Sequence, residues 1–302
     1  MRKTCLEEIY NLAKKDKRIV FVGSDLGAGV LSQFKDEIPD RFFMEGISEQ
    51  HVIGLSAGLA MNGFIPYVNT IATFITRRCF EQIVVDVALH NLPVRLIGSG
   101  GGLVYAPLGP THLAIDDIAL IRTIPNMTIV AVSDAVEMKK FMQESVDYNG
   151  PIYIRLAKGG DPIVTSANRV FKIGKSYLVN KGKDILLITT GISLQIALKA
   201  KEMLIEKGIN PGVLHVPTIK PIDKQAIIKY SKIFKSITTI EEGIISGGLG
   251  TAVGEILQET DYKGTFRKVG IPNKFSDKYG SQNDLLKYYK ITPEDICHYV
   301  IS

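Results

Sequence analysis

The chain has 302 residues, of which 45% are hydrophobic and 22% are charged, and it contains no tryptophan. This composition is typical of a soluble globular protein and excludes collagen-like and intrinsically disordered classes. The formal net charge of +5 arises from 36 Lys and Arg residues interspersed with 31 acidic residues. No basic run is long enough to form a nucleic-acid-binding stripe, so we expect no nucleic-acid partner. At about 100 to 200 residues per domain, the length predicts two domains.

The cysteines and the N-terminus indicate the compartment. Cys5, Cys79 and Cys297 are far apart and odd in number, which argues against a disulfide framework and against a structural zinc site. The first residues carry charges where a signal peptide would be apolar, and no run reaches about 18 apolar residues. We therefore expect a cytoplasmic protein that does not associate with membranes.

Helical and strand patterns alternate in the first half of the chain. Apolar residues recur at helical spacing over residues 6–13, and RIVFVGSD (18–25) then reads as a buried strand. The segments that follow are, in order, a strand FIPYVNT (64–70), a helix CFEQIVVDVALHN (79–91), strands LPVRLIGSG (92–100) and MTIVAVSD (127–134), and a helix AVEMKKFMQESVDY (135–148). Such alternation predicts an α/β domain with a largely parallel sheet flanked by helices.

A second series of the same kind begins after residue 172. It comprises, in order, a strand within YLVNKGKDILLITTG (177–191), a helix SLQIALKAKEMLIEKG (193–208), a strand PGVLHVPTIKP (211–221), a strand, glycine turn and helix in KSITTIEEGIISGGLGTAVGEIL (235–257), and a late strand FRKVGIP (266–272). We place the domains at residues 1–165 and 172–302, with the boundary in the Gly-Asp-Pro and Ser-Ala-Asn segment.

Two glycine-rich loops could bind a ligand. GGLG at 247–250 lacks the full dinucleotide-binding fingerprint, and a tight turn that opens a helix is the simpler interpretation. GSGGGLVYAPLGPTH at 98–112 combines flexible glycines, a proline turn and a histidine after a predicted strand. Ligands in open α/β sheets bind beyond the carboxyl ends of the strands, so this second loop is a candidate site.

Glu49 stands in FFMEGISEQHVIGLSAGLAMNGFIPYV, residues 42–68, directly before a helix of small residues where its carboxylate is expected to be partly buried. An ionised carboxylate hidden from water is costly unless a partner hydrogen-bonds or neutralises it. At a helix N-terminus it could complement the helix dipole, by about 0.3 to 1 kcal/mol. In a dry pocket it could instead bind a ligand nitrogen through a charged hydrogen bond of about 1.5 to 3 kcal/mol. The residues alone leave both interpretations open.

Other candidate residues have ordinary structural explanations. Taken alone, Phe74 is typical of a core aromatic, His112 of a surface or structural histidine, and Arg77 and Arg78 of a solvated face. The position of His112 in the loop after a strand favours a functional role.

Several ordered segments together resemble the C-terminal half of transketolase, in the thiamine diphosphate enzyme superfamily. They are GISEQHVIGLSAGLAMNGFIPYV, ATFITRRCFEQI, LGPTHLAIDDIALIRTIPNMTIV, GPIYIRLAKGG and, in the second half, EEGIISGGLGTAV. The resemblance implies that residues 1 to about 165 form a pyrimidine-binding domain and that residues 172–302 form the transketolase C-terminal domain. The implied reaction is transfer of a two-carbon ketol unit between sugars or sugar phosphates, which belongs to carbohydrate metabolism.

The resemblance also implies roles for five residues. Glu49 matches the glutamate that hydrogen-bonds N1' of the cofactor's aminopyrimidine, and Phe74 matches an aromatic that stacks on that ring. His112 matches a histidine that contacts sugar hydroxyls, and Lys158 stands where relatives have an arginine that binds the acceptor's phosphate. Arg77 aligns with a phosphate-contacting arginine of 1-deoxyxylulose-5-phosphate synthases.

The implied enzyme needs a second chain. No Gly-Asp-Gly motif followed by an Asn, which in full transketolases holds magnesium and the cofactor's diphosphate, is present. We therefore expect a companion N-terminal transketolase subunit that ligates Mg²⁺, with two copies of each chain in an α2β2 heterotetramer. The isolated chain would hold only half of each cofactor site.

The sequence departs from the family pattern at two points. The loop ahead of Leu108 is about one residue longer than in relatives, with glycines where a phosphate-binding histidine often stands. Leu108 replaces the family's aspartate before Gly-Pro-Thr-His, and leucine cannot accept a hydrogen bond from a substrate hydroxyl. The identity and phosphorylation of the acceptor therefore stay open.

The main alternative function is that of the β subunit of a 2-oxo acid dehydrogenase first component, although Gly-Pro-Thr-His and Lys158 favour transketolase. A half of a 1-deoxyxylulose-5-phosphate synthase and a catalytically silent scaffold subunit are further alternatives.

Overall fold

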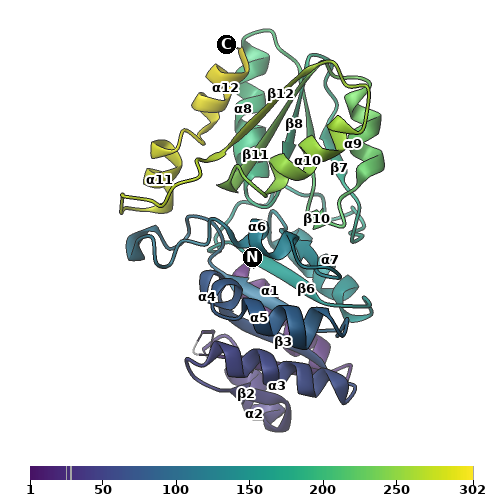
Figure 1. Ribbon diagram of the computed structural model, residues 1–302, viewed down its shortest axis with the longest axis vertical. Helices are drawn as coiled ribbons and strands as arrows, with labels where there is room; N and C mark the ends of the chain where they lie inside the picture. The colour runs from purple at the N-terminus through teal and green to yellow at the C-terminus, as the bar shows by residue number, and fades with distance from the viewer. Residues whose placement is uncertain (25, 28, 302) are drawn as a thin grey trace.

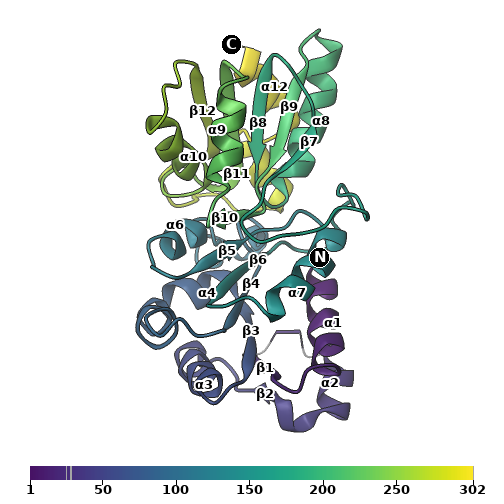
Figure 2. The same cartoon turned by 90° about the vertical axis from the view of Figure 1, so that its right-hand side faces the viewer.

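The computed structural model describes residues 1–24, 26–27 and 29–301, which form two sheets with helices on both faces. Figures 1 and 2 show the two α/β layers stacked along the long axis, with the N-terminal half below and the C-terminal half above. Each sheet is parallel apart from one strand. The predicted fold class is therefore confirmed.

The first sheet has the strand order β10-β5-β6-β4-β3-β1-β2. Its strands are β1 (Ile19–Gly23), β2 (Phe42–Met44), β3 (Ile65–Ile71), β4 (Arg95–Ser99), β5 (Thr128–Val130), β6 (Ile152–Leu156) and β10 (Thr218–Lys220). The associated helical segments are α1 (Arg2–Ala13), α2 (Ser32–Glu37), η1 (Pro39–Arg41), α3 (Glu49–Met61), α4 (Ala72–Arg77), α5 (Phe80–Gln82), η2 (Ile83–Ala88), η3 (Ala106–Leu108), α6 (Asp117–Arg122) and α7 (Ala135–Val146).

The second sheet has the order β12-β11-β8-β9-β7. Its strands are β7 (Tyr177–Asn180), β8 (Ile185–Thr189), β9 (Pro211–His215), β11 (Ser236–Ile244) and β12 (Thr265–Ile271). Its helices are α8 (Ser193–Glu206), α9 (Lys224–Ser231), α10 (Leu249–Gln258), α11 (Gln282–Tyr288) and α12 (Pro293–Ile301).

The central strands of the first sheet are almost wholly buried because both faces of the sheet are covered. In β1 every residue is buried. One face of the first sheet packs with α1 and α7, and the other packs with α3, η2 and α6. This double cover leaves the ends of the strands as the place where polar side chains can meet.

One strand crosses from the second half of the chain into the first sheet. The segment 211–221, expected as a single strand, is divided into β9 in the second sheet and β10, which pairs antiparallel with β5. Lys220 Nζ donates to the carbonyl oxygen of Arg122 at 3.1 Å. Residues from the second half therefore complete the edge of the first sheet.

The GGLG turn binds a carboxylate of its own chain. The Glu241 carboxylate accepts hydrogen bonds from the backbone N–H groups of Leu249 and Gly250, both at 2.8 Å. A Cβ atom on Gly248 would lie 2.0 Å from Glu241 Oε2, so the turn requires a glycine there. The helix N-terminus that could attract an anion is already satisfied, in agreement with the simpler interpretation of this loop.

Candidate active site

Four predicted site residues lie along the carboxyl edge of the first sheet. Glu49 opens α3 just after β2, Phe74 lies in α4 directly after β3, His112 lies in the loop after β4, and Lys158 follows β6. These strands occupy the adjacent sheet positions β6-β4-β3-β1-β2. Because the carboxyl ends of parallel strands share one edge, residues more than a hundred positions apart in sequence line the same rim.

Glu49 is buried, with a relative exposure of 5%, at the first position of α3. Its two carboxylate oxygens accept hydrogen bonds from Arg78 Nη1 at 3.1 and 3.0 Å. Arg78, which the sequence placed on a solvated face, has a side chain that is 47% exposed and still covers the buried carboxylate. Nothing in the sequence distinguished this arginine as the partner of Glu49.

Phe74 is partly buried, and its ring has two polar neighbours. The Arg78 guanidinium carbon lies 3.8 Å from the centre of the Phe74 ring. The His112 ring meets Phe74 edge to face, with centroids 5.1 Å apart and planes inclined by 64°. Arg78 thus links Glu49 to Phe74, and Phe74 links His112 to both. Phe74 belongs to this cluster and not to the apolar core.

The Cys79 thiol lies behind the cluster and stays protonated. Burial, reinforced by the nearby Glu49 carboxylate, raises the pKa of Cys79 to about 12. Its Sγ donates toward the carbonyl oxygen of Phe74 at 3.7 Å. This cysteine therefore acts as a buried packing group and not as a thiolate nucleophile.

The loop that carries His112 is held by the second domain. Backbone N–H of Leu103 donates to Glu242 Oε1 at 2.8 Å. Gly109 has a φ of +75°, and a Cβ atom there would lie 2.3 Å from the Tyr279 ring. In Figure 1 the long loop between the two layers reaches toward α11, which contacts η3. The loop geometry thus depends on both halves of the chain.

Within this loop the histidine ring is oriented locally. The Nδ1 atom of His112 lies 2.9 Å from Thr111 Oγ1, and the backbone N–H of His112 donates to the Gly109 carbonyl oxygen at 3.0 Å. These bonds and the edge-to-face contact hold the His112 ring against Phe74. The histidine would therefore lie close to a ligand stacked on Phe74.

Arg77 has partners that differ from those of its neighbour Arg78. Its Nη2 donates to Asp116 Oδ1 at 2.7 Å and to the carbonyl oxygen of Leu113 at 3.3 Å. Its side chain is 30% exposed. The guanidinium therefore fastens α4 to the segment after His112, and a phosphate at Arg77 would have to share it with Asp116.

Lys158 lies at a small cavity of about 220 Å³, which is also lined by Arg2, Gly100, Tyr105 and Leu108. Two cations thus face a cavity that has an apolar and aromatic wall. Sequence reasoning did not identify Arg2, because a cation near the start of a chain is common and belongs to no pattern. Lys158 also borders a cleft of about 490 Å³ between the segment 158–162 and helices α8 and α11 of the second half.

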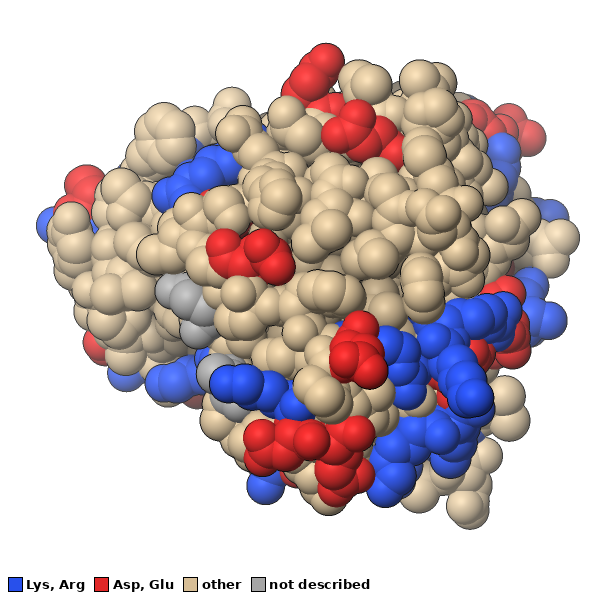
Figure 3. Space-filling model, turned by 90° about the horizontal axis from the view of Figure 1, so that it is seen from below, with Lys and Arg blue, Asp and Glu red and all other residues tan. Residues whose placement is uncertain are grey.

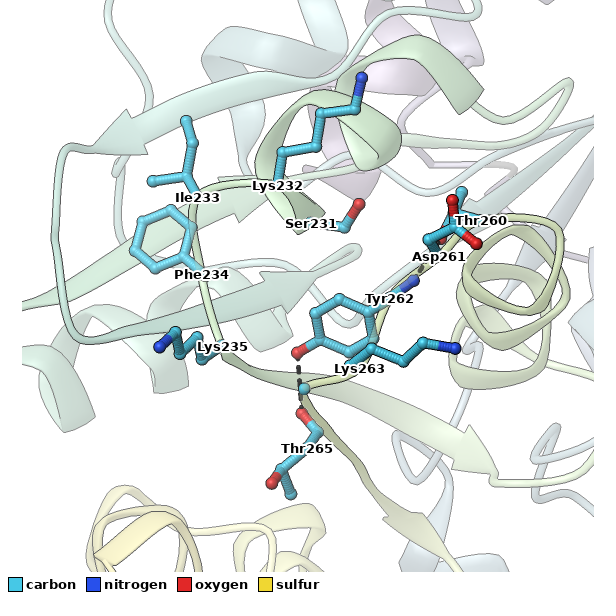
Figure 4. Close-up of a pocket in the computed structure, with 11 residues that line it drawn as sticks. Ser231, Lys232, Ile233, Phe234, Lys235, Thr260, Asp261, Tyr262, Lys263 and Thr265 are labelled. Atoms are coloured by element: carbon cyan, nitrogen blue, oxygen red, sulfur yellow. Dashed lines mark hydrogen bonds between the residues drawn. The ribbon is translucent and has the colours of Figure 1, made fainter.

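A larger hollow lies elsewhere and is a weaker candidate. Its volume is about 720 Å³, and Figure 4 shows Lys232, Lys235 and Lys263 among the residues that line it. The hollow lies where β11 and β12 begin, with Tyr262 Oη donating to the Thr265 carbonyl oxygen at 3.0 Å. Ligands of α/β sheets bind at the opposite, carboxyl edge.

The groups around Glu49 fit an aminopyrimidine ring. A buried carboxylate can accept a hydrogen bond from a protonated ring nitrogen, and an adjacent aromatic face can stack on the ring.

Over the described residues, no group of three or more His, Cys, Asp or Glu side chains is arranged to hold a metal ion. None of the helices in residues 1–24, 26–27 and 29–301 is both long and apolar enough to cross a bilayer.

Comparison with known families gives two matches in tandem. Residues 1–160 match the transketolase pyrimidine-binding domain, and residues 174–296 match the transketolase C-terminal domain. Among solved structures, a split-gene transketolase described as an inactive β4 tetramer has a TM-score of 0.91 at 32% identity, with coverage of 99% of this chain and 96% of that chain. A transketolase from Campylobacter jejuni, at 17% identity and a TM-score of 0.83, shares the fold.

Curated relatives fall into two groups by length. A putative transketolase C-terminal section from Methanocaldococcus jannaschii is 35% identical and covered to 95%. One subunit of an apulose-4-phosphate transketolase from Phocaeicola vulgatus is 37% identical and also covered to 95%. A 1-deoxy-D-xylulose-5-phosphate synthase from Clostridium beijerinckii is 38% identical over 97% of this chain, which spans only 47% of that longer protein.

Proposed function

The chain belongs to the transketolase family, and we propose that it is one subunit of a two-chain, thiamine diphosphate-dependent transketolase. It would transfer a two-carbon ketol unit from a ketose donor to an aldose acceptor. The observation that carries the proposal is the buried Glu49 carboxylate beside the Phe74 ring at the carboxyl edge of the first sheet. Relatives of matching length, described as a C-terminal section and as a subunit of transketolases, support it.

Each residue of the cluster has a chemical task in this proposal. Thiamine diphosphate, when bound, supplies the carbanion chemistry. Glu49 would hold a hydrogen bond to N1' of the aminopyrimidine and so polarise the ring from a site shielded from water. Phe74 would fix the plane of that ring by stacking. His112, at the edge of Phe74, would contact hydroxyls of the sugar.

The anionic end of a substrate would lie at the two cations. Lys158 and Arg2 border the same small cavity, and Leu108 forms part of its wall. We propose that Lys158 holds a phosphate or similar anion of the acceptor, with Arg2 beside it. Arg77 would contribute to phosphate binding only by sharing its guanidinium with Asp116. Leu108 would leave the acceptor's α-hydroxyl without the usual carboxylate partner.

The companion subunit would bring magnesium and bind the diphosphate, in an α2β2 assembly. The outward face of α3 has no charged residue between its first turn and Met61, and Gly54 and Gly58 have open space where a side chain would stand. Figure 3, which views the end of the molecule where α2 and α3 lie, shows a broad area without Lys, Arg, Asp or Glu. Such a face allows the close approach of another helix.

The cellular location belongs to the same proposal. Cys5, Cys79 and Cys297 are all buried and free. Unpaired thiols of this kind are typical of a reducing compartment, and we place the enzyme in the cytoplasm.

The decisive experiment replaces Glu49 with Gln in the chain assembled with its companion, thiamine diphosphate and magnesium. Loss of a charged hydrogen bond of about 1.5 to 3 kcal/mol predicts a loss of at least about tenfold to one hundredfold in ketol-transfer rate. Glu7→Gln, which removes a half-exposed carboxylate on α1, serves as the matched control. Full activity in the Glu49 variant would refute the assignment, and an inactive wild-type assembly would indicate a silent scaffold.

The purified chain alone is expected to show no ketol transfer and to bind the cofactor feebly. The solved relative described as an inactive β4 tetramer supports this expectation. Substantial activity of the chain without any companion would contradict the split-subunit proposal.

The 38% identity with the C. beijerinckii protein favours a second candidate, the C-terminal half of a 1-deoxyxylulose-5-phosphate synthase. The product of the reaction distinguishes the transketolase proposal from the synthase proposal. A ketose lengthened by a two-carbon unit supports transketolase, whereas a 1-deoxy sugar phosphate supports the synthase.

A further inference from the structure

Arg78 makes contacts that a bound heterocycle would need. Its Nη1 donates to both oxygens of Glu49, at 3.0 and 3.1 Å. Its guanidinium carbon lies 3.8 Å from the centre of the Phe74 ring. One planar cationic group therefore satisfies the buried carboxylate and covers the aromatic face at the same time.

An aminopyrimidine would use these same two surfaces. A guanidinium and a protonated aminopyrimidine are both planar, both carry N–H donors in the plane, and both present a π face. Arg78 engages both oxygens of the Glu49 carboxylate, and the face of Phe74 that it covers accepts one stacked partner. Arg78 in this position and a ring held by Glu49 and Phe74 therefore exclude each other.

The side chain of Arg78 can leave without disturbing the core. Arg78 is the C-cap residue directly after α4, and its side chain is 47% exposed. Its backbone is held separately, because Gln50 Nε2 donates to the Arg78 carbonyl oxygen at 3.0 Å. Rotation about the side-chain bonds would carry the guanidinium into solvent while the backbone keeps its place.

We infer that Arg78 occupies the aminopyrimidine position in the free chain and is displaced when the cofactor binds. The inference rests on the proposed cofactor site. It also explains how the isolated chain keeps Glu49 buried, because a buried ionised carboxylate without a partner is costly. Arg78 thus stabilises the free half-site and competes with the cofactor for it.

The test measures cofactor binding to Arg78 variants of the full chain. Arg78→Met removes the charge and keeps a flexible side chain, Arg78→Lys keeps the charge without the planar fork, and Arg18→Met is the control. Arg18 is an exposed arginine paired with Asp16. The probes are thiamine for the chain alone and thiamine diphosphate with Mg²⁺ for the chain with its companion, by calorimetry or ligand-observed NMR.

Arg78→Met is expected to lower the dissociation constant of both probes about tenfold, with Arg78→Lys intermediate and Arg18→Met unchanged. An equal or higher dissociation constant in Arg78→Met would overturn the inference while leaving the proposed cofactor site intact. Binding by Arg78→Met alone, with none by the wild type, would support the inference strongly. Absence of binding in both would overturn the inference and the cofactor site together.

A second measurement needs only the wild-type chain and covers the case in which Arg78→Met fails to fold. The Nε–H proton of Arg78, assigned by its loss in Arg78→Lys, is expected to show the ring-current shift of a group lying over Phe74. Saturation with thiamine should move this signal to the position of a solvent-exposed arginine. A signal that stays in place while thiamine binds would overturn the inference.

Discussion

The ring of His112 lies edge-on to the ring of Phe74, with centroids 5.1 Å apart. Phe74 follows β3 and His112 lies in the loop after β4, and these strands are neighbours in the sheet. The contact therefore joins the residue proposed to stack on the cofactor to the residue proposed to contact the sugar. Substitution of either residue should therefore alter the position of the other ring.

Phe74→Leu should weaken cofactor binding in the assembled enzyme. Loss of an aromatic pair worth about 0.5 to 1.5 kcal/mol predicts an increase of roughly twofold to tenfold in the cofactor's dissociation constant. The KM for the donor sugar should rise as well, because His112 loses the ring that orients it. Calorimetry and steady-state kinetics measure the two effects, with Phe266→Leu in β12 as the matched control. Unchanged cofactor affinity would contradict the stacking role of Phe74.

His112→Asn should separate substrate contact from cofactor binding. The asparagine keeps a polar group but does not reach as far, and loss of a hydrogen bond of about 1.5 kcal/mol or more predicts at least about a tenfold fall in kcat/KM. The cofactor's dissociation constant should stay close to that of the wild type. His298→Asn, on α12 of the second domain, provides the control. A variant that loses cofactor but keeps kcat at saturation would assign His112 to cofactor binding instead.

Lys158→Met should weaken the binding of a phosphorylated acceptor more than that of an uncharged one. Removal of the ammonium group is expected to raise the KM for a phosphorylated acceptor about tenfold, through loss of a charge-assisted contact of roughly 1.5 kcal/mol. The KM for an uncharged aldose should change little, and Lys158→Arg should restore most of the affinity. Equal effects on charged and uncharged acceptors would show that Lys158 does not read the anionic group.

The sequence predicted those parts of the fold that depend on local pattern. The buried strand β1 is a continuous apolar run, β3 and β4 each have an apolar stretch next to a turn signal, and α7 and α8 have helical periodicity, so neighbouring residues suffice to identify these elements. The strand β10 has three residues and pairs with β5, almost ninety positions earlier. No local signal distinguishes it from a continuation of β9, because only the packed structure shows which sheet it joins.

At the candidate site, too, local sequence predicted the burial of a residue but not its contact partner. Burial of Glu49 was predictable from the small apolar residues of its helix, and the need for a partner followed from the cost of a buried charge. The partner itself was not predictable, since Arg77 and Arg78 are adjacent and chemically identical. Arg78 turns to Glu49 and Arg77 turns to Asp116, and this choice is made by the three-dimensional path of α4.

Asp134 anchors the segment that connects the two halves of the chain. Its carboxylate accepts hydrogen bonds from backbone N–H of Glu137 at 2.9 Å, Val164 at 2.8 Å and Thr165 at 2.7 Å. Burial acts to raise the pKa of Asp134, but these bonds and the Thr165 hydroxyl outweigh it and lower the pKa below its ordinary value. An acid whose pKa is lowered by folding stabilises the fold when it is ionised.

Asp134→Asn should therefore lower the free energy of unfolding at pH 7 by about 1 to 3 kcal/mol, because the amide lacks the charge and offers one acceptor oxygen. The stabilisation by Asp134 is fully present above the pKa of the unfolded chain, about 3.9, and is lost as the pH falls through the lower pKa of the folded state. The difference between wild type and variant, measured by urea unfolding from pH 7 downward, should shrink below about pH 4. Asp147→Asn, at an 87% exposed side chain, is the control, and a difference that stays constant down to acid pH would contradict this account.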